Sequence, residues 1–321
     1  MQKDRRQFLK QTAWTALGIG TLGLTACTDR STTSKTSPVK ASPPSSDPLF
    51  QISLAQWSLH RAFKAGTIDN LDFALTARQD FGITAVEYVS KLFKTRARDQ
   101  PYLRELKKRA DDNGVQSLLI MVDDEGPLAE PDNNIRNEAI KKHYQWVEAA
   151  QMLGCHSIRV NLEGRGSADD LAGPAVDGLA SLASFAKDYQ INVIVENHGG
   201  PSSNAQWLAK VIGQVRMPNC GTLPDFGNFC ILKKDEDCIE AYDRYRGMQE
   251  LLPFAKALSA KSYDFDEAGQ ETSIDFRRMM ELVKAGGYRG YVGVEYEGDR
   301  LSEPEGVRAT KRLLEKVIAE L

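Results

Sequence analysis

Three apolar segments of the chain end in carboxylates. Glu196 closes a Val-Ile-Val run, Asp225 follows Thr-Leu-Pro, and Glu295 closes Val-Gly-Val. Side chains two positions apart on a strand point to the same face, so we expect His198 on the face of Glu196. We expect Glu297 on the face of Glu295 for the same reason. If that face is the inside of a barrel, these anionic oxygens converge in one cavity.

Several carboxylates in one cavity of low dielectric repel one another strongly. The usual remedies are a bound divalent cation, a basic partner or raised carboxyl pKa values. Oxygen ligands with one imidazole suit Mn, Mg, Co or Zn, and the sequence does not choose among these metals. We therefore expect a divalent metal, with an ion-free network of carboxylates and lysine as the alternative.

The elements that carry these residues are short apolar runs that alternate with amphipathic segments of helical period, as in parallel strands joined by crossover helices. The expected strands are Gln51–Trp57, Ala85–Val89, Gln116–Val122, Ser157–Asn161, Asn192–His198, Gly221–Asp225, Ala257–Ser262 and Tyr291–Tyr296. Helical patterns begin near Ile68, Pro101, Asn134, Asp169, Asn204, Glu236, Ile274 and Pro304. Eight such units over about 270 residues predict a single (β/α)8 TIM barrel at 50–321. A doubly wound open sheet is the alternative, because the pattern does not show that the first strand meets the last.

The segment from Gln51 to Leu321 resembles sugar phosphate isomerases and epimerases of the xylose isomerase-like TIM-barrel superfamily. The resemblance implies a divalent metal held by a Glu ending strand five, an Asp ending strand six, a His on strand seven and a Glu ending strand eight. By position, Glu196, Asp225 and Glu295 match the three carboxylates. The resemblance also implies that the two glutamates act as acid and base on the two faces of a sugar carbon.

The chain departs from the family pattern at two places. On strand seven the His-containing motif is replaced by Leu-Ser-Ala-Lys-Ser, which places Lys261 where the imidazole ligand is missing. After Asp225 the family often continues to a His, whereas this chain has Phe-Gly-Asn, and Asn228 can bind a sugar hydroxyl but is a poor metal ligand. Lys261 could replace the cation and polarise a carbonyl or enediolate oxygen. Alternatively, His198 supplies the missing nitrogen.

Further candidates for sugar binding lie at the other strand ends. They are Gln56, Trp57 and His60 after strand one, Glu87 on strand two, Asp123 and Glu125 after strand three, and Arg159 with Asn161 on strand four. An aromatic side chain beside hydrogen-bonding groups suits the apolar face of a sugar ring. Each also has a structural alternative. Trp57 could fill the core and His60 could cap a helix. Glu87 could have no role other than an ion pair with Arg159 inside the barrel.

The first 27 residues predict an export signal. Arg5-Arg6 is typical of a twin-arginine motif, residues 12–24 form a short apolar stretch, and Leu-Thr-Ala-Cys ending at Cys27 resembles a lipobox. Residues 28–49, rich in Ser, Thr, Pro and Lys, predict a disordered tether. We therefore expect an exported protein on the periplasmic or envelope side, held at the membrane only by a lipid on Cys27. A buried cysteine at the start of a domain is the alternative.

Four further cysteines follow the tether. Cys155, Cys220, Cys230 and Cys238 lack the CxxC spacing of metal sites. Cys155 and Cys220 are expected on buried strands as small apolar residues. No disulfide is predicted, although an oxidising compartment would permit one.

The charge balance limits the partners of the chain. It has 41 Lys and Arg against 44 Asp and Glu, a formal net charge of −3. This balance gives no basic face for nucleic acid and suits a small neutral substrate better. The loops expected after strands seven and eight are acidic and would repel phosphate, and sugar phosphates are scarce outside the cytoplasm. We therefore predict an unphosphorylated sugar as the substrate.

The leading interpretation is a carbohydrate isomerase or epimerase. In it, Glu196 or Glu295 removes a proton next to a carbonyl, and a metal or Lys261 stabilises the enediolate. The same abstraction followed by loss of a substituent would make a lyase or hydrolase of keto-glycosides. A lipid-anchored sugar-binding protein that has lost catalysis is the alternative of another class. Phosphodiester cleavage is disfavoured, because it needs several metal-binding histidines and the chain has four His in all.

Overall fold

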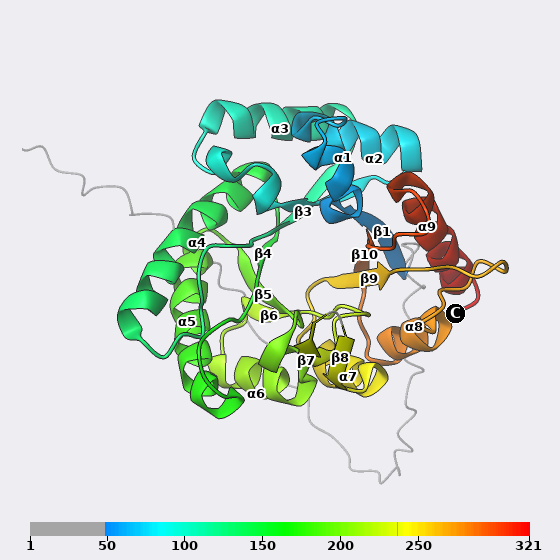
Figure 1. Ribbon diagram of the computed structural model, residues 1–321. Coiled ribbons are helices and arrows are strands. Elements are labelled where there is room, and N and C mark those ends of the chain that lie inside the picture. The colour runs from blue at the N-terminus through cyan, green and yellow to red at the C-terminus, as the bar shows by residue number, and fades with distance from the viewer. Residues whose placement is uncertain (1–48, 236) are drawn as a thin grey trace, which may run out of the picture. The chain divides into compact units, whose positions relative to one another are not determined.

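The computed structural model describes residues 49–235 and 237–321. Eight parallel strands form one curled sheet, and the helices lie on its outer side (Figure 1). The strands are β1 Phe50–Ala55, β2 Ala85–Val89, β3 Gln116–Met121, β4 Ser157–Val160, β5 Asn192–Glu196, β6 Cys220–Leu223, β9 Leu258–Ser262 and β10 Gly290–Tyr296. Each of the eight predicted strands therefore has a counterpart.

The strand order distinguishes a barrel from an open doubly wound sheet. It runs β6-β5-β4-β3-β2-β1-β10-β9, so that β1 pairs with both β2 and β10. The two ends of this sheet are joined by isolated parallel bridges, Thr222 with Ala255 and Asp225 with Ser259. The fold is TIM-barrel-like, as predicted, and the carboxyl ends of all eight strands point to one side.

The outer layer consists of helices that begin at conventional caps. They are α2 Phe73–Phe81, α3 Gln100–Asp112, α4 Asn133–Leu153, α5 Ala168–Asp188, α6 Ala205–Val215, α7 Arg244–Leu251, α8 Phe276–Ala285 and α9 Glu303–Ala319, with a short α1 at His60–Lys64. An Asp, Asn or Ser side chain accepts a backbone hydrogen bond at the start of each helix from α3 to α9. No helix in the described ranges has both the length and the hydropathy needed to cross a membrane.

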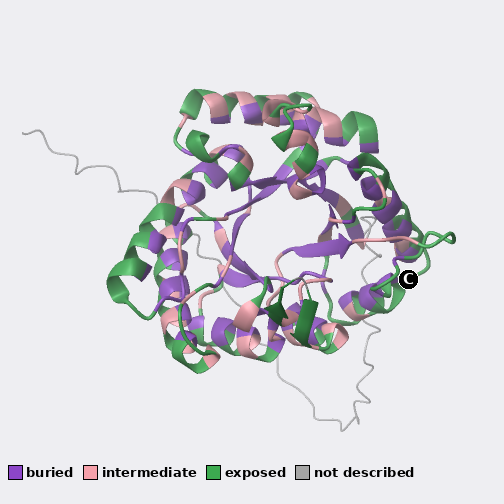
Figure 2. Cartoon of the chain, in the orientation of Figure 1, coloured by how far each residue is buried: buried purple, intermediate pink, exposed green. Residues whose placement is uncertain are grey.

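The apolar core has two parts. The larger part fills the space between the sheet and the helices, and the strands are buried accordingly (Figure 2). The smaller part lies inside the barrel and includes Ala85 and Ala257 near the strand starts, with Leu119 and Ile194 further along. Apolar side chains thus fill much of the lower interior of the barrel.

One predicted helix is wrong. The sequence predicts a helix from about Glu236, whereas the structure has an antiparallel hairpin of β7 Cys230–Lys234 and β8 Asp237–Ala241, and α7 begins only at Arg244. No disulfide was predicted from the sequence, whereas Cys230 and Cys238 are bonded across the hairpin. The Lys-Lys-Asp-Glu-Asp run between them resembles an exposed helix. Asp235, however, has a φ of +54° and reverses the chain there.

The remaining cysteines and the N-terminus complete the comparison with the sequence. Cys155 and Cys220 are free and buried, as predicted. The predicted export signal with Cys27, and the predicted tether up to residue 48, lie outside the described residues.

Candidate active site

The three carboxylates expected from the sequence meet at the carboxyl ends of β5, β6 and β10. One oxygen from each of Glu196, Asp225 and Glu295 lies within 4.8 Å of the others. The three residues are 1 %, 0 % and 3 % exposed, respectively. The bridge between Asp225 and Ser259 fixes the segment after β6 against β9, and the Ser259 hydroxyl donates to Glu295 Oε2 at 2.7 Å. We refer to these three carboxylates as the triad.

A lysine ammonium lies against the triad. Lys261 is opposite Glu295 in the pairing of β9 with β10 and is 1 % exposed. Its Nζ lies 3.3 Å from Glu295 Oε1, 3.3 Å from Glu297 Oε2 and 4.0 Å from Asp225 Oδ2. Burial opposes the charge of the ammonium, but the surrounding carboxylates outweigh burial and raise the pKa of Lys261 well above its usual value. Lys261 is therefore charged in the folded protein.

A guanidinium compensates the other side of the triad. Arg159 Nε lies 2.8 Å from Glu196 Oε2, and Arg159 Nη1 donates to Asp123 Oδ1 at 2.7 Å. The same Asp123 oxygen accepts from Asn161 Nδ2 at 3.1 Å, and Asn228 Nδ2 donates to Glu196 Oε1 at 3.0 Å. Asn228 thus contacts a carboxylate of the triad rather than the cavity.

Different surroundings give the three carboxyl groups different pKa values. Burial raises the pKa of Glu196 to about 7 against the opposing charge of Arg159. Burial likewise raises the pKa of Asp225 to about 7, although Lys261 opposes it. At Glu295 burial also acts upward, but the charge of Lys261 and the Ser259 hydrogen bond outweigh it and lower the pKa. Glu295 is therefore the member of the triad that stays ionised at neutral pH.

The donor set of the triad can be compared with the needs of a divalent ion. By spacing, three carboxylate oxygens within 4.8 Å could hold such an ion. Asp225 Oδ1 accepts from the backbone N–H groups of Gly227 and Asn228, whereas Oδ2 has no hydrogen bond and faces Lys261. Two unit positive charges 4 Å apart repel by about 4 kcal/mol at an effective dielectric of 20, and a dication would be repelled more. The triad as built therefore fits the ammonium better than a divalent ion.

Glu87 lies inside the barrel, away from the cavity. Its Oε1 accepts from the Ser53 hydroxyl at 2.6 Å, and its Oε2 has no hydrogen-bond partner. Gly293 leaves room for it, since a Cβ there would lie 2.6 Å from Glu87 Oε1. Burial raises the pKa of Glu87 to about 8. The pairing of Glu87 with Arg159 considered from the sequence is not among the ion pairs, because Arg159 points to Asp123 and Glu196.

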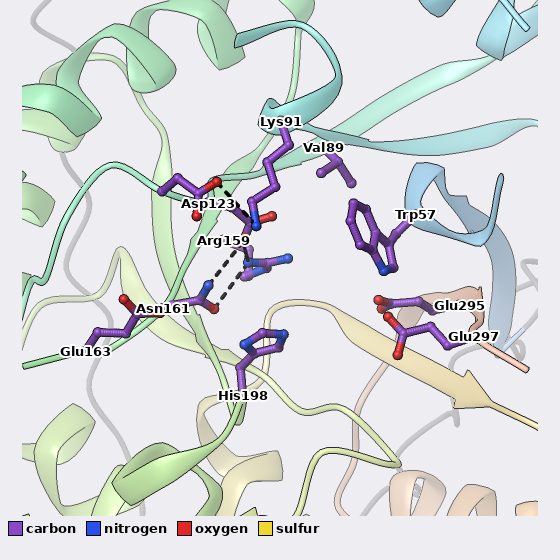
Figure 3. Close-up of a pocket in the computed structure, with 11 residues that line it drawn as sticks. Trp57, Val89, Lys91, Asp123, Arg159, Asn161, Glu163, His198, Glu295 and Glu297 are labelled. Atoms are coloured by element: carbon purple, nitrogen blue, oxygen red, sulfur yellow. Dashed lines mark hydrogen bonds and ion pairs between the residues drawn. The ribbon is translucent and has the colours of Figure 1, made fainter. Parts of the chain in front are cut away.

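A cavity of about 200 Å³ opens above the triad. Its lining side chains converge from several strand ends (Figure 3). They are Trp57, Val89, Lys91, Asp123, Asp124, Arg159, Asn161, Glu163, His198, Glu295 and Glu297. Glu295 is thus the only member of the triad that lines the cavity, while Glu196, Asp225 and Lys261 lie beneath the surface.

Trp57 forms the aromatic wall of the cavity. It is stacked on His60 with ring centroids 4.6 Å apart, and His60 Nδ1 contacts the Trp57 carbonyl oxygen at 2.8 Å. His60, predicted to bind substrate, therefore supports Trp57 from behind rather than lining the cavity. His198 does line the cavity, but the triad cluster does not include it. Desolvation of the ring and the charges of Arg159 and Lys261 lower the pKa of His198.

Three polar residues of the cavity are missing from the sequence prediction. Lys91 stands two residues beyond the end of β2, and Asp124 and Glu163 stand three residues beyond β3 and β4. Their position just past a strand end was the available signal. Conversely, Gln56 and Glu125 were candidates, but Gln56 binds Asn70 and the Val89 backbone, and Glu125 accepts from a buried Trp146.

The family of the chain follows from its sequence and is consistent with this fold. A family model described as "Xylose isomerase-like TIM barrel" matches residues 75–317. The chain belongs to this family. This match confirms the resemblance expected from the sequence. The structural neighbours likewise include a sugar phosphate isomerase/epimerase.

Solved structures with the same fold include enzymes of sugar chemistry. A 3-keto-D-glucoside 4-epimerase from E. coli, YcjR, is 15 % identical and has a TM-score of 0.58, covering 84 % of this chain and 100 % of its own. The IOLI protein with a bound zinc atom is 14 % identical with a TM-score of 0.63, covering 84 % of this chain and 98 % of its own. At these identities the likeness shows the fold alone.

A shorter match links the chain to a curated protein. It is 37 % identical over 54 residues to the C-glycoside deglycosidase alpha subunit of Arthrobacter globiformis. This match spans 17 % of the chain and 15 % of that relative.

Proposed function

We propose that this protein is a carbohydrate isomerase or epimerase that removes a proton next to a carbonyl of an unphosphorylated sugar. The observation that carries the proposal is the position of Glu295. Its ionised carboxylate lines a polar cavity with one aromatic wall, and Ser259 and Lys261 hold it in place. The sugar epimerase among the structural neighbours supports the same class of chemistry.

The first chemical step uses the walls of the cavity as well as Glu295. The sugar ring packs on Trp57, and its hydroxyls bind Asn161 and His198. Glu295 takes the proton from the carbon, and the electron pair of the broken C–H bond moves to the carbonyl oxygen to give an enediolate. Arg159 lines the cavity with a fixed positive charge and stabilises that oxygen.

The return of the proton distinguishes an isomerase from an epimerase. An isomerase can move the proton along one face of the sugar with Glu295 alone, whereas an epimerase needs a second group on the opposite face. Glu196 is our proposed second group, because its pKa of about 7 lets it carry a proton near neutrality while Glu295 does not. To reach the sugar, Glu196 needs Arg159 or Asn228 to move aside, since both contact it in the structure.

The charge of the cavity supports a substrate without phosphate. Among its lining residues, five carboxylates face two cationic side chains, Lys91 and Arg159. Arg159 is already paired with Asp123 and Glu196, and Lys91 lies 3.3 Å from Asp124. A phosphate dianion would therefore meet a net negative wall.

The direct test is hydrogen exchange at carbon. The protein is incubated in deuterated water with a panel of free ketoses, aldoses and 3-keto-glycosides, and deuterium at sugar carbons is followed by NMR. We expect exchange with at least one class of sugar, and a loss of about 10²- to 10⁴-fold in Glu295→Gln. Glu163→Gln is the matched control, because Glu163 lines the same cavity but does not contact Lys261 or Arg159. A folded protein that exchanges no sugar on the panel, yet binds one, would instead be the non-catalytic sugar-binding protein.

A second function uses the same base. Proton abstraction from a keto-glycoside can be followed by expulsion of the substituent one carbon away, which makes the enzyme a lyase. The partial match to the C-glycoside deglycosidase subunit and the keto-glucoside epimerase fold favour this candidate. Chromatography that detects release of a free aglycone from a 3-keto-glycoside would identify the lyase. An isomerase or epimerase would leave the glycosidic bond intact.

Export and metal content complete the proposal. We propose that the chain is exported and held in the cell envelope by a lipid on Cys27, so that Cys27→Ser would move the protein from the membrane fraction to the soluble fraction. Unchanged fractionation would reject the lipid anchor. Occupancy of the triad by Mn, Mg, Co or Zn stays a prediction from the sequence, and no step above passes through a metal.

A further inference from the structure

We infer that Lys261 is the resident cation of the triad and that its ammonium takes the place of a divalent ion there. Its role in sugar chemistry rests on the proposed function, but its place in the triad rests on geometry alone. The starting observation is its position among three carboxylates from two chain segments. They are Asp225 after β6, Glu295 on β10 and Glu297 just after β10, at 3.3 to 4.0 Å from Nζ.

The surroundings of the lysine stem are shaped for it. A Cβ at Gly227 would lie 3.2 Å from Cγ and from Cδ of Lys261, and 2.8 Å from the Tyr263 hydroxyl. Only the absence of that atom lets the stem pass without displacing its neighbours. The Gly227 N–H in turn donates to Asp225 Oδ1 at 2.8 Å, so the glycine both admits the lysine and orients its partner.

Two cationic side chains already stand against the triad. Lys261 faces Asp225 and Glu295, and Arg159 faces Glu196, so each member of the triad has a positive partner within 4.0 Å. An ammonium has three N–H donors and no lone pair, so it is not a metal ligand. A divalent ion among the same oxygens would have to displace or neutralise a lysine that is 1 % exposed.

The consequence for catalysis is that Lys261 acts through Glu295. Its ammonium does not line the cavity, so it does not reach a substrate oxygen, contrary to the role considered from the sequence. It is a positioning residue that holds Glu295 and Glu297 together. Lys261 therefore positions the proposed base, Glu295, without a bound ion.

The experiment measures Co²⁺ binding, with activity as a separate readout. Wild-type protein and Lys261→His are dialysed against a chelator, titrated with Co²⁺, and followed by visible absorption and calorimetry. We expect no triad-bound Co²⁺ in the wild type. We expect one ion per chain in Lys261→His, bound at least roughly 100-fold more tightly than any Co²⁺ that the wild type binds. The reason is that the substitution both adds an imidazole ligand and removes the ammonium. Asp225→Asn in the Lys261→His background should abolish that binding.

Two further measurements keep the inference falsifiable if Lys261→His does not fold. The metal content of the wild type as purified should be far below one ion per chain, and Asp225→Asn in the wild type should not change it. Stoichiometric metal that is lost in Asp225→Asn would overturn the inference, whatever the activity. Conversely, a wild type without sugar exchange would reject the proposed function and leave the inference about Lys261 untouched.

Discussion

The floor and the walls of the cavity are built in different ways. On the floor, Glu196, Asp225 and Lys261 are at most 1 % exposed, and each lies against an oppositely charged partner. On the walls, Lys91 and Glu163 are exposed and stand just beyond the ends of β2 and β4. Strands fix side chains closely, and loops vary more easily. The difference suggests that the floor sets the reaction and the walls set which sugar enters.

The largest expected effect breaks the floor at its cation. Lys261→Met leaves Asp225, Glu295 and Glu297 facing one another without their ammonium. Removing one partner of a buried ion pair costs about 3–5 kcal/mol of stability. Lys91→Met is the matched wall variant, because Lys91 makes one exposed ion pair, worth about 0–1 kcal/mol. Urea unfolding of both variants tests the contrast, and equal losses would show that the floor is no more tightly coupled than the walls.

The sequence was enough to predict the parts of the site that strands define. Glu196, Asp225 and Glu295 could be placed together because each ends an apolar run, and carboxyl ends of parallel strands meet on one side. Lys261 was foreseeable for the same reason. The environment of Glu87 was not, because β2 and β3 shift register between Val86 and Glu87, and such an irregularity leaves no mark in the pattern of apolar residues.

The loops and the hairpin depend on contacts that sequence patterns do not contain. Lys91, Asp124 and Glu163 reach the cavity because their loops fold over it, which depends on neighbours distant in the chain. The segment of β7 and β8 has charged residues at spacings that also suit an exposed helix. Its pairing depends on a turn at Asp235 and on the bond between Cys230 and Cys238, and neither is visible in periodicity.

A second prediction concerns the charge beneath the floor. Burial raises the pKa of the Glu87 carboxyl from its ordinary value of 4.5 to about 8 in the folded protein. Between these values the unfolded chain releases the proton while the folded protein keeps it, so stability falls as pH rises. At about 1.4 kcal/mol per pKa unit, the loss between pH 5 and pH 8 is on the order of 3 kcal/mol. Glu87→Gln mimics the protonated group and should remove this part of the decline.

Unfolding curves at pH 5 and pH 8 provide the measurement for Glu87. Glu163→Gln serves as the control, because Glu163 is exposed. Its stability should change with pH as that of the wild type does. If Glu87→Gln and the wild type lose stability in parallel, the Glu87 carboxyl is not held protonated by burial.

A third prediction addresses the aromatic wall. Trp57→Ala removes the ring on which the sugar packs, so KM should rise about tenfold while kcat changes less, because the floor is untouched. His60→Ala is the control, since His60 stacks behind Trp57 and does not line the cavity. It should raise KM by a smaller factor. A fall in kcat with constant KM in Trp57→Ala would place the ring in the reaction rather than in binding.

The smallest effect is expected at the hairpin of β7 and β8. Asn228, just before β7, is held without the disulfide, because its carbonyl oxygen accepts from Asn197 Nδ2 at 3.0 Å and from the Ser203 hydroxyl at 2.8 Å. Replacing Cys230 and Cys238 together by Ser should therefore loosen β7 and β8, seen as faster amide exchange there. Sugar exchange should fall by no more than about twofold, since a loosened hairpin leaves Glu295 and its partners in place. A tenfold loss would mean that the hairpin orders Asn228 and Glu196. The hairpin would then belong to the floor rather than to the walls.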